Sequence, residues 1–564
     1  MSVYLSKPWL KSYEAGVPET IDYRKICMPD VLNETVAKFP TKDALIFQGY
    51  KMNFTQMSEM VDKFAVKLTE FGVKKGDAVA ILLPNCIPCV VAYFSVLKIG
   101  AIVVMNNPLY SDPELEHQFN DSGSKVLVTL DLLANRMIDL RKKTGIKQIV
   151  YTSMGDYLPF PKNLLFPLVA EKKGLAPKGG VKVASDVYKW KDCIASAQGK
   201  PAKVMLGFNE VAMYQYTGGT TGVSKGVMLT HANLSCHSQF AKAWFPKMKM
   251  GEEIMLGALP YFHVFGMSVC MNFAIYMGWP QVLIPRPQPE PLLEAIAKFR
   301  PTFAPLVPTM YIGMLSHPNL KKTDMTCMRA AFSGSAPLPV EVIKEFEEIT
   351  GATIVEGFGM TETSPVTHIN PFSGGKRKPG TVGVPVSDTL AKIVDLEDGV
   401  TEMPVGERGE LIVSGPQIML GYKGKPEETA NTLKDGWIYT GDIAIMDEDG
   451  YFSIVDRKKD MIISGGYNVY PRDIDEVYYQ HPKVQEACSI GVPDIKRGEN
   501  VKLFIVLKDG ESATEQEMID FGKQSLAAYK LPSEVEFRKE LPKTNVGKIL
   551  RKELRAEELA KRKA

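Results

Sequence analysis

Residues 217 to 226 read Thr-Gly-Gly-Thr-Thr-Gly-Val-Ser-Lys-Gly. The glycines leave the backbone free to turn and to bring its N–H groups close to a ligand. Together with the hydroxyls and one lysine, these groups favour a polyphosphate. The common P-loop places Lys directly after its last Gly, whereas Val223 and Ser224 separate Gly222 from Lys225 here. The stretch therefore predicts a nucleotide-phosphate loop of a different kind.

Length and composition predict a multidomain globular protein. The chain has 564 residues, which exceeds one ordinary hydrophobic core, so at least two domains are expected. It is 45% hydrophobic and 23% charged, as globular proteins are. Its net charge of +2 gives no argument for binding nucleic acid or a membrane surface. The first residues, Met-Ser-Val-Tyr-Leu-Ser-Lys-Pro, lack the apolar segment of a secretory signal, and we expect a cytoplasmic protein.

The longest apolar region, residues 79–105, is interrupted by prolines, Asn85, a lysine and a glycine, which disfavour a membrane span. It predicts a buried strand, a turn and a helix instead. Eight cysteines are scattered along the chain without a secretory context, so free thiols are expected. The lone pair Cys86 and Cys89 lacks the second pair that a zinc site requires. Structural thiols are therefore favoured over a metal or redox site.

From about residue 200 onward, short apolar runs alternate with helical periods, a pattern typical of strands connected by helices. The expected elements are a strand at 205–216 before the glycine loop, a helix at 233–244, a strand at 328–332, a helix at 339–350 closed by Gly351, and a strand at 352–355. The pattern predicts an α/β core with its function on loops that follow strands.

A domain boundary is predicted near residue 457. The turn at 447–450 closes a hairpin, and the charged stretch 456–460 follows it. Beyond this point we expect strands at 486–491, 501–507 and 535–538 and a helix at 514–528, enough for a small α+β domain. The predicted domains are 1–457 and 458–564.

Six further segments accompany the glycine loop in a fixed order. They are Pro-Tyr-Phe-His-Val-Phe-Gly at 260–266, Ser-Gly-Ser-Ala-Pro at 333–337, Glu-Gly-Phe-Gly-Met-Thr-Glu at 356–362, residues 409–422 from Gly-Glu-Leu to Gly-Tyr, Trp-Ile-Tyr-Thr-Gly-Asp at 437–442 with Asp-Arg at 456–457, and Pro-Lys-Thr-Asn-Val-Gly-Lys at 542–548. In this order they resemble the acyl-adenylate-forming superfamily of acyl-CoA synthetases, adenylation domains and beetle luciferases. The similarity is closest to bacterial long-chain fatty acid CoA ligases and covers residues from about 50 to 555.

The resemblance implies a large N-terminal AMP-binding domain of layered α/β subdomains and a small mobile C-terminal α+β domain. It also implies a two-step ligase whose substrates are a fatty acid, ATP and CoA, with Mg²⁺ as the metal. A carboxylate attacks the α-phosphate of ATP, pyrophosphate leaves, and the CoA thiol then takes the acyl group. Both partners of the first step are anions, so we expect cations to converge on the reacting atoms.

The same resemblance implies a set of nucleotide-binding residues. The phosphates would lie against Thr217, Gly218, Gly219, Thr220, Thr221, Gly222 and Lys225. The adenine pocket would comprise Gly334, Ser335, Ala336, Glu356, Gly357, Phe358, Gly359, Met360 and Thr361, and the ribose would bind Asp442 and Arg457. Many relatives carry Tyr where this chain has Phe358, a change that keeps the stacking face and loses a hydroxyl.

Catalytic and conformational roles also follow from the resemblance. Lys548 would act at the α-phosphate, because a point charge on a flexible stem can neutralise the developing charge. Lys225 would act at the β- and γ-phosphates, and His263 would close the pocket beside the substrate carboxylate, with a core histidine satisfied by the backbone as the alternative. Thr217 and Glu362 would approach the metal, a hard cation that suits a carboxylate and phosphate oxygens. Lys459 matches the hinge position, and Gly465 and Gly466 would approach CoA.

The acyl pocket is predicted to be apolar. It would comprise His263, Val264, Phe265, Gly266, Thr309, Gly334 and Pro365. The segment 261–266 has no carboxylate, so the ammonium group of an amino acid would remain unpaired there. Overall similarity favours a medium- or long-chain fatty acid, and an aromatic acid such as a cinnamate or benzoate is the alternative.

Three other functions are disfavoured, and one remains as an alternative. A peptide synthetase module is disfavoured because the chain stops soon after Lys548 without a carrier domain, and a luciferase because Ile463 stands where those enzymes carry a lysine. A noncatalytic nucleotide-binding protein is disfavoured because Lys548, Glu362 and Lys225 are all present. A fatty acyl-AMP ligase delivering to a carrier protein is the main mechanistic alternative. No nucleic-acid partner is expected, whereas a homodimer and transient peripheral contact with a membrane remain open.

Overall fold

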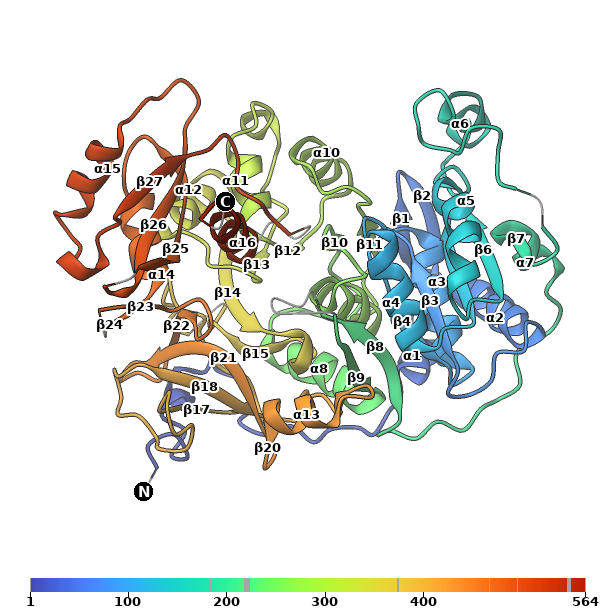
Figure 1. The fold of residues 1–564 in the computed structure, drawn as a ribbon. Coiled ribbons are helices and arrows are strands. Elements are labelled where there is room, and N and C mark those ends of the chain that lie inside the picture. The colour runs from blue at the N-terminus through green and yellow to red at the C-terminus, as the bar shows by residue number, and fades with distance from the viewer. Residues whose placement is uncertain are drawn as a thin grey trace. The chain divides into compact units, whose positions relative to one another are not determined.

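The computed structural model describes residues 2–182, 184–217, 224–372, 375–465, 467–494, 496–544 and 549–562 (Figure 1). The chain forms two compact units. The larger unit comprises Ser12–Thr389 and Ser414–Leu433, and the smaller unit comprises Met1–Lys11, Leu390–Val413 and Lys434–Ala564.

An eight-stranded sheet of the larger unit carries the glycine loop. Its strand order is β19-β9-β8-β4-β3-β5-β6-β7, in which the neighbours from β8 to β7 pair in parallel. The strands are β3 (Ala78–Leu82), β4 (Ile102–Met105), β5 (Val126–Leu130), β6 (Gln148–Thr152), β7 (Val187–Lys189), β8 (Val211–Tyr216), β9 (Gly226–Thr230) and β19 (Gly421–Tyr422). Because β8 and β9 are antiparallel neighbours, the glycine loop joins two adjacent strands.

A nine-stranded sheet completes the larger unit. Its order is β16-β15-β14-β13-β12-β10-β11-β1-β2, and β10 to β14 run parallel. The strands are β1 (Asp43–Phe47), β2 (Tyr50–Asn53), β10 (Met255–Gly257), β11 (Gln281–Leu283), β12 (Phe303–Leu306), β13 (Ala330–Ser333), β14 (Thr353–Gly359), β15 (Val366–Ile369) and β16 (Val384–Pro385). The ends of β13 and β14 carry the predicted adenine segments.

Helices connect these strands, as the alternating pattern predicted. They are α1 (Met28–Lys38), α2 (Phe54–Glu70), α3 (Ile87–Lys98), α4 (Asp112–Ser122), α5 (Asp131–Leu140), α6 (Lys162–Ala170), α7 (Trp190–Ser196), α8 (His231–Trp244), α9 (Phe273–Met277), α10 (Pro289–Phe299), α11 (Pro308–Leu315), α12 (Val340–Thr350) and α13 (Pro426–Thr432). A π-helical segment, Gly266–Asn272, leads into α9. The apolar region 79–105 forms β3, the buried helix α3 and β4, which confirms the interior position predicted for it.

Most predicted elements of the larger unit are confirmed, with differences at their ends. Helix α12 ends at Gly351 with φ +71°, the left-handed conformation that favours glycine. Helix α8 begins at His231 rather than at residue 233, because Thr230 and Asn233 form a capping box there. The strand predicted from residue 205 begins only at Val211. That part of the prediction was wrong because a turn lies between them, in which Glu210 N–H donates to the carbonyl of Gly207 at 3.0 Å.

The smaller unit contains two sheets of five strands. The first comprises β17 (Leu390–Val394), β18 (Gly409–Ser414), β20 (Leu433–Lys434), β21 (Trp437–Met446) and β22 (Phe452–Arg457). The second comprises β23 (Ile462–Ser464), β24 (Tyr467–Val469), β25 (Val484–Asp494), β26 (Gly498–Leu507) and β27 (Glu534–Phe537). The helices are α14 (Pro471–Tyr479), α15 (Glu515–Gly522) and α16 (Arg551–Lys561). All three strands predicted beyond residue 485 are confirmed.

Helix α15 is shorter than the predicted helix 514–528. It ends at Gly522, where an added Cβ would lie 2.3 Å from the hydroxyl oxygen of Tyr478. The helix therefore packs closely against α14 at its end, and Ala528–Lys530 form a separate 3-10 turn. The α/β class is confirmed. The domain boundary between residues 457 and 458 stays a prediction, because it marks where the C-terminal domain is expected to rotate.

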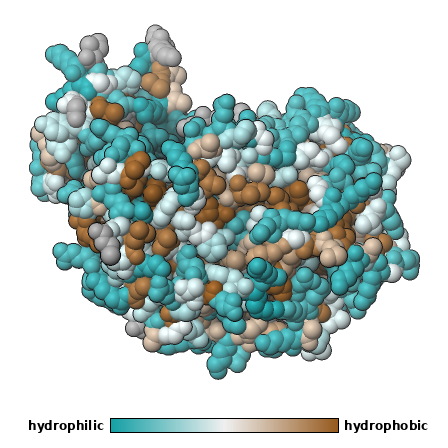
Figure 2. Space-filling view, turned by 90° about the horizontal axis from the view of Figure 1, so that it is seen from below, coloured by the Kyte–Doolittle hydropathy of each residue, from teal (hydrophilic) through white to brown (hydrophobic). Residues whose placement is uncertain are grey.

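The surface is mainly hydrophilic, and the cysteines are free thiols. Hydrophilic residues make up most of the face seen in Figure 2, and hydrophobic residues occupy smaller areas of it. Within the described ranges no helix is long and apolar enough to cross a membrane. All eight cysteines are free thiols, and burial raises the pKa of Cys86 to about 12. A thiolate is therefore disfavoured at that position.

Four histidines of the larger unit give it a pH-dependent stability. Burial lowers the pKa of His231 and His263 to about 4 and that of His237 and His368 to about 3. Unfolding would return each pKa to its ordinary value near 6.5, so the unfolded chain binds more protons below pH 6.5. The free energy of unfolding is therefore fully retained above pH 6.5 and falls by ~1.4 kcal/mol per pH unit per histidine as the pH drops toward 4.

Replacing His237 should remove one quarter of this effect. Both of its ring nitrogens are buried without a hydrogen-bond partner in the described structure. We expect His237→Leu to reduce the loss of unfolding free energy between pH 7 and pH 5 by ~2 kcal/mol, measured by denaturant titration. Between pH 8 and pH 7 the two proteins should change alike, and equal losses down to pH 5 would contradict the assignment.

Candidate functional site

The two ends of the glycine loop are held together at β8 and β9. Thr217 N–H donates to the carbonyl of Lys225 at 3.1 Å. Ser224 is tied to α4, because Gln118 Nε2 donates to its hydroxyl at 3.2 Å and His117 Nε2 lies 2.9 Å from its carbonyl oxygen. The predicted phosphate ligands Gly218, Gly219, Thr220, Thr221 and Gly222 lie outside the described residues.

Lys225 carries the cation of this loop and already has a partner. Its Nζ lies 2.9 Å from Glu428 Oε2 on α13 and 4.2 Å from the centre of the Tyr422 ring. Both partners therefore position the ammonium group. An anionic phosphate would have to compete with the carboxylate of Glu428 for this lysine.

Glu362 lies in a 3-10 turn, Thr361–Thr363, directly after β14. Its side chain is buried, and Tyr422 donates its hydroxyl to Oε1 at 2.7 Å. Burial and this carboxylate raise the pKa of Tyr422, so the phenol stays protonated and remains a donor. Lys225 and Glu362, predicted to act on the phosphates and the metal, are thus joined through the same tyrosine.

The glycines of the predicted adenine segments lie close against neighbouring backbone and aromatic rings. A Cβ on Gly359 would lie 1.8 Å from the carbonyl oxygen of Pro365, and one on Gly357 would lie 2.5 Å from the ring of Phe332. At Gly334 the nearest atom to an added Cβ would be the ring of Phe265, at 3.0 Å. Glycine is required at these positions because any side chain would displace its neighbours.

Other residues of the adenine set border these glycines. Glu356 is buried, and its carboxylate accepts the N–H of Gly380 at 2.8 Å. The half-buried Phe358 ring lies 6.0 Å from the ring of His368 at an angle of 64°. Ser335 is exposed and has φ +71°. Ala336 follows β13, Met360 and Thr361 follow β14, and all three are half-buried.

The segment predicted to bind the acyl group is positioned by Asn85, which follows β3. Asn85 Nδ2 donates to the carbonyls of Gly257 and Leu259 at 2.9 and 2.7 Å, and its Oδ1 accepts the N–H of Tyr261 at 2.8 Å. Gln215 on β8 also contributes, since its Nε2 donates to the carbonyl of Phe262 at 2.8 Å. One buried asparagine thus fixes the loop between β10 and the π-helix.

His263 is a neutral hydrogen-bonding group at neutral pH, because desolvation lowers its pKa to about 4. Phe265 N–H donates to its Nδ1 at 3.3 Å, which leaves the ring proton on Nε2 as a donor. Val264, Phe265 and Gly266 are buried beside it, and Pro365 is buried at the start of the segment leading to β15. Thr309, at the first turn of α11, is exposed.

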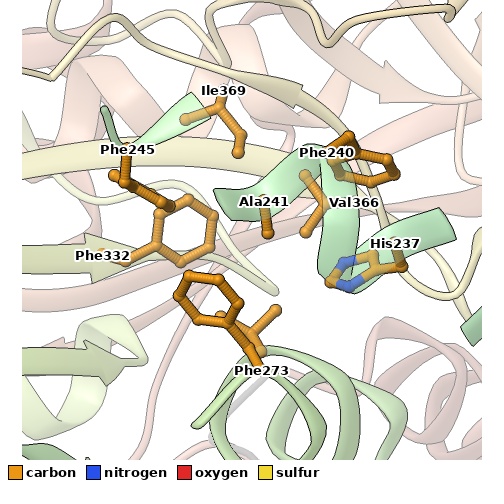
Figure 3. A pocket seen from close by; sticks show the side chains of 9 residues that line it. His237, Phe240, Ala241, Phe245, Phe273, Phe332, Val366 and Ile369 are labelled. Atoms are coloured by element: carbon orange, nitrogen blue, oxygen red, sulfur yellow. The ribbon is translucent and has the colours of Figure 1, made fainter. Parts of the chain in front are cut away.

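A cavity of about 10 Å³ lies behind this segment (Figure 3). Its lining is aromatic and aliphatic except for one histidine, and comprises His237, Phe240, Ala241, Phe245, Val269, Phe273, Phe332, Val366 and Ile369. Phe332 also packs against Phe265, with ring centres 5.6 Å apart. The space suffices for about one water molecule, so an acyl chain entering here would have to move these rings.

In the smaller unit, Asp442 and Arg457 face each other across β21 and β22. Their side chains form an ion pair, Nε to Oδ1, at 3.0 Å, and the carboxylate is buried. Gly441, with φ +70°, precedes Asp442, and its N–H donates to Glu410 Oε1 at 3.1 Å. Asp442 is thus held in one orientation by its strand partner.

Lys459 lies in the turn after Arg457, where desolvation lowers its pKa to about 8. Gly465 has φ +58° and open space around its Cβ position. Gly466 and Lys548 lie outside the described residues. The chain on either side of residues 545–548 is held together, because Lys543 and Ile549 form an antiparallel bridge and Leu550 N–H donates to the carbonyl of Pro542 at 2.8 Å.

Comparison with known families identifies this arrangement. The chain matches the model of the AMP-binding enzyme family over residues 32–423 and that of the AMP-binding enzyme C-terminal domain over residues 473–548. The chain belongs to the AMP-binding enzyme family. Its predicted resemblance to the acyl-adenylate-forming superfamily is thereby confirmed.

Individual relatives of this AMP-binding enzyme extend over its whole length. A long-chain-fatty-acid–CoA ligase of Bacillus subtilis (strain 168) is 45% identical over 558 residues, 98% of each chain. The corresponding ligase of Escherichia coli O6:H1 is 39% identical over 559 residues, again 98% of each chain. The solved structure of the anthranilate CoA ligase AuaEII with anthranoyl-AMP matches with a TM-score of 0.83 and 27% identity, over 96% of this chain and 98% of that one.

Sequence reasoning missed three residues that position this AMP-binding enzyme's site. Tyr422 was quoted as part of a motif without a role, although an aromatic hydroxyl there could have suggested one. Asn85 was treated only as an interruption of an apolar run. Glu428 was given no role, because Pro-Glu-Glu at 426–428 is the sequence of a typical helix start. Only the fold brings it to Lys225.

Removing the carboxylate of Glu428 should ease ATP binding. Glu428→Gln keeps the side chain's shape and releases Lys225 from its partner, and we expect the KM for ATP to fall about two- to fivefold, the range of a partly exposed ion pair. Pyrophosphate release at low ionic strength measures this effect.

Glu427→Gln is the matched control. Glu427 is the exposed neighbour on the same helix, and the ion pairs of the described residues do not include it. An equal change in KM for both variants would mean that general surface charge, rather than the contact with Lys225, is responsible.

Proposed function

We propose that this chain is an ATP-dependent fatty acid CoA ligase. It activates a medium- or long-chain carboxylic acid as an acyl adenylate with release of pyrophosphate, and then transfers the acyl group to CoA. The observation that carries the proposal is the 45% identity over 98% of each chain with a long-chain-fatty-acid–CoA ligase. An acid–thiol ligase of this kind requires ATP and CoA as substrates.

The surroundings of the acyl segment support an acid without a second charge. His263 is uncharged at neutral pH, and the residues that follow it, Val264 to Gly266, are apolar and buried. An ammonium group placed there would lose its hydration without gaining a carboxylate. An aryl acid remains the second candidate, since a structural neighbour with 27% identity is an anthranilate CoA ligase.

In the adenylation step, a carboxylate oxygen of the acid attacks the α-phosphorus and the bond to pyrophosphate breaks. We assign Lys225 and the glycine loop to the β- and γ-phosphates, where the ammonium group would exchange Glu428 for phosphate oxygens. Lys548 neutralises charge at the α-phosphate. In the second step the CoA sulfur attacks the acyl carbonyl, its proton is lost and AMP leaves.

A divalent metal fits the donor set of the larger unit. Glu362 offers one buried carboxylate, and Thr217, half-buried at the start of the loop, offers a hydroxyl. Within the described ranges no cluster of three or more His, Cys, Asp or Glu side chains could hold a metal ion by itself. This matches Mg²⁺, which takes few protein ligands and completes its shell with phosphate oxygens and water. Bound there, Mg²⁺ would offset the phosphate charge.

The remaining predicted roles complete the proposal. Asp442 accepts hydrogen bonds from the ribose hydroxyls, and Arg457 keeps its carboxylate oriented at 3.0 Å. Lys459 is the hinge between domains 1–457 and 458–564, and Gly465 with Gly466 admits CoA. Rotation about this hinge would exchange Lys548 for the thiol between the two steps. A cytoplasmic location is part of the same proposal.

Acid-dependent release of pyrophosphate tests the proposed function directly. The full chain is assayed with saturated acids from acetate to stearate and with benzoate and cinnamate, each with and without CoA. Long-chain acids should give the highest kcat/KM, with acyl-CoA as product. Preference for benzoate or cinnamate would establish the aryl alternative, and acyl-AMP without acyl-CoA would establish a fatty acyl-AMP ligase. If no acid is activated, the proposal fails.

Lys548→Ala should separate the two half-reactions. We expect acyl-AMP formation to fall about 100- to 1,000-fold, as when a donor to a developing oxyanion is removed, whereas supplied acyl-AMP should still be converted to acyl-CoA. Lys539→Ala, at an exposed lysine of the same predicted domain, is the control and should leave both steps unchanged. Equal loss of both half-reactions in Lys548→Ala would refute the assignment.

A further inference from the structure

Helix α6 (Lys162–Ala170) presents apolar side chains to solvent. Figure 1 shows it as a short helix at the edge of the larger unit, joined by loops at both ends. The exposed fractions of Leu164, Leu165, Leu168 and Val169 are 63%, 54%, 72% and 42%. Outside the helix, Phe160 is 79% exposed and Leu175 is 37% exposed. Single exposed leucines are common, but this many within one short segment form a patch.

The apolar residues cover a continuous face of the helix. At 100° per residue, Leu164, Leu168, Leu165 and Val169 fall in that order within an arc of about 140°. Asn163, Phe166 and Ala170 lie on the opposite side and are half-buried or buried. A Cβ on Gly155 would touch the Phe166 ring at 2.4 Å, so this ring anchors the helix to the turn after β6. The contact of Phe166 therefore keeps the leucine face directed toward solvent. The exposed face of a helix that contacts only water is usually polar, whereas this face is apolar.

Lysines surround this patch. Lys162, Lys172, Lys173 and Lys178 are exposed, and the ion pairs of the described residues do not include them. Residues 160–180 carry a formal net charge of +3 with Glu171 as the one acidic residue, whereas the whole chain carries +2. A net positive charge thus lies beside this stretch of exposed apolar side chains.

We propose that residues 160–178, here called the α6 patch, bind the surface of an anionic lipid bilayer. An amphipathic helix with leucines on one face and lysines at its borders inserts its apolar side chains between lipids while the lysines contact the anionic headgroups. A second copy of the chain is a poorer occupant, because twofold pairing of the patch would bring like-charged lysines together.

The benefit of membrane binding to this enzyme rests on the proposed function. A long-chain fatty acid partitions into bilayers, since each methylene adds to its membrane affinity. An enzyme held at the bilayer would meet its acid at a higher local concentration. The α6 patch would thus raise the rate on acids dissolved in lipid without any role in the chemical steps.

Vesicle flotation with the full chain tests the proposal. The probes are vesicles of phosphatidylcholine alone and of phosphatidylcholine with phosphatidylglycerol. The protein should bind the anionic vesicles, and the bound fraction should fall as salt is raised. Leu164→Glu/Leu168→Glu should weaken partitioning at least about tenfold. Lys172→Glu/Lys173→Glu should abolish the preference for phosphatidylglycerol. Unchanged binding of both double variants would overturn the proposal.

Val400→Glu is the matched control, because Val400 is 75% exposed in the other unit, and it should bind vesicles as the unmodified protein does. Circular dichroism and the midpoint of thermal unfolding establish that the variants fold. If Leu164→Glu/Leu168→Glu changes only the sedimentation equilibrium of the protein, the patch binds a second copy instead and the proposal is refuted.

A kinetic comparison separates this inference from the proposed function. Leu164→Glu/Leu168→Glu should retain the rate on a water-soluble acid such as octanoate and lose rate on palmitate dissolved in anionic vesicles. A variant that loses both rates alike would contradict a role confined to the membrane. If no form of the protein activates any acid, the proposed function fails. Vesicle flotation would still show whether the α6 patch binds an anionic bilayer.

Discussion

The bond from the Tyr422 hydroxyl to the buried carboxylate of Glu362 is the contact on which the larger unit's site depends. Residues 414–433 leave the smaller unit after Val413 and belong to the larger unit until Leu433. Glu362 holds them there twice, since its carbonyl also accepts the N–H of Met419 at 2.8 Å. A hydrogen bond to a charged group contributes about 1.5–3 kcal/mol, and leaving such a carboxylate buried without a partner would cost at least as much.

The same contact arranges the charges that the reaction needs. With Tyr422 fixed by Glu362, its ring supports Lys225, and α13 brings Glu428 to the lysine from the side. Lys225 therefore lies close to the carboxylate of Glu428 and is joined to Glu362 through Tyr422. Under the proposed function, the phosphates of ATP would replace Glu428 as the partner of Lys225. Binding and release of pyrophosphate would both be moderated by that exchange.

The sequence predicted most helices and strands well, because their starts and ends depend on residues that are close together in the chain. The period of apolar residues and the terminal Gly351 give α12, and the capping residues Thr230 and Asn233 account for where α8 begins. The adenine segments were predicted from motifs that follow strands, and the fold places them at the ends of β13 and β14. Contacts between distant segments could not be predicted: nothing in the sequence near Lys225 indicates that Glu428 is its partner.

Two properties of helix α6 could not be predicted from the sequence for a different reason: which of its faces is exposed, and how its local charge differs from that of the whole chain. Its apolar residues have a helical period, and the period alone does not tell which face meets the core. Only the burial of Phe166 and Ala170 shows that the leucines point outward. The net charge of +2 argued against a membrane surface because it averages a local +3 with the rest of the chain. Screening confines electrostatic attraction to about 10 Å, so a lipid surface responds to the charge of the α6 patch and not to that of the whole protein.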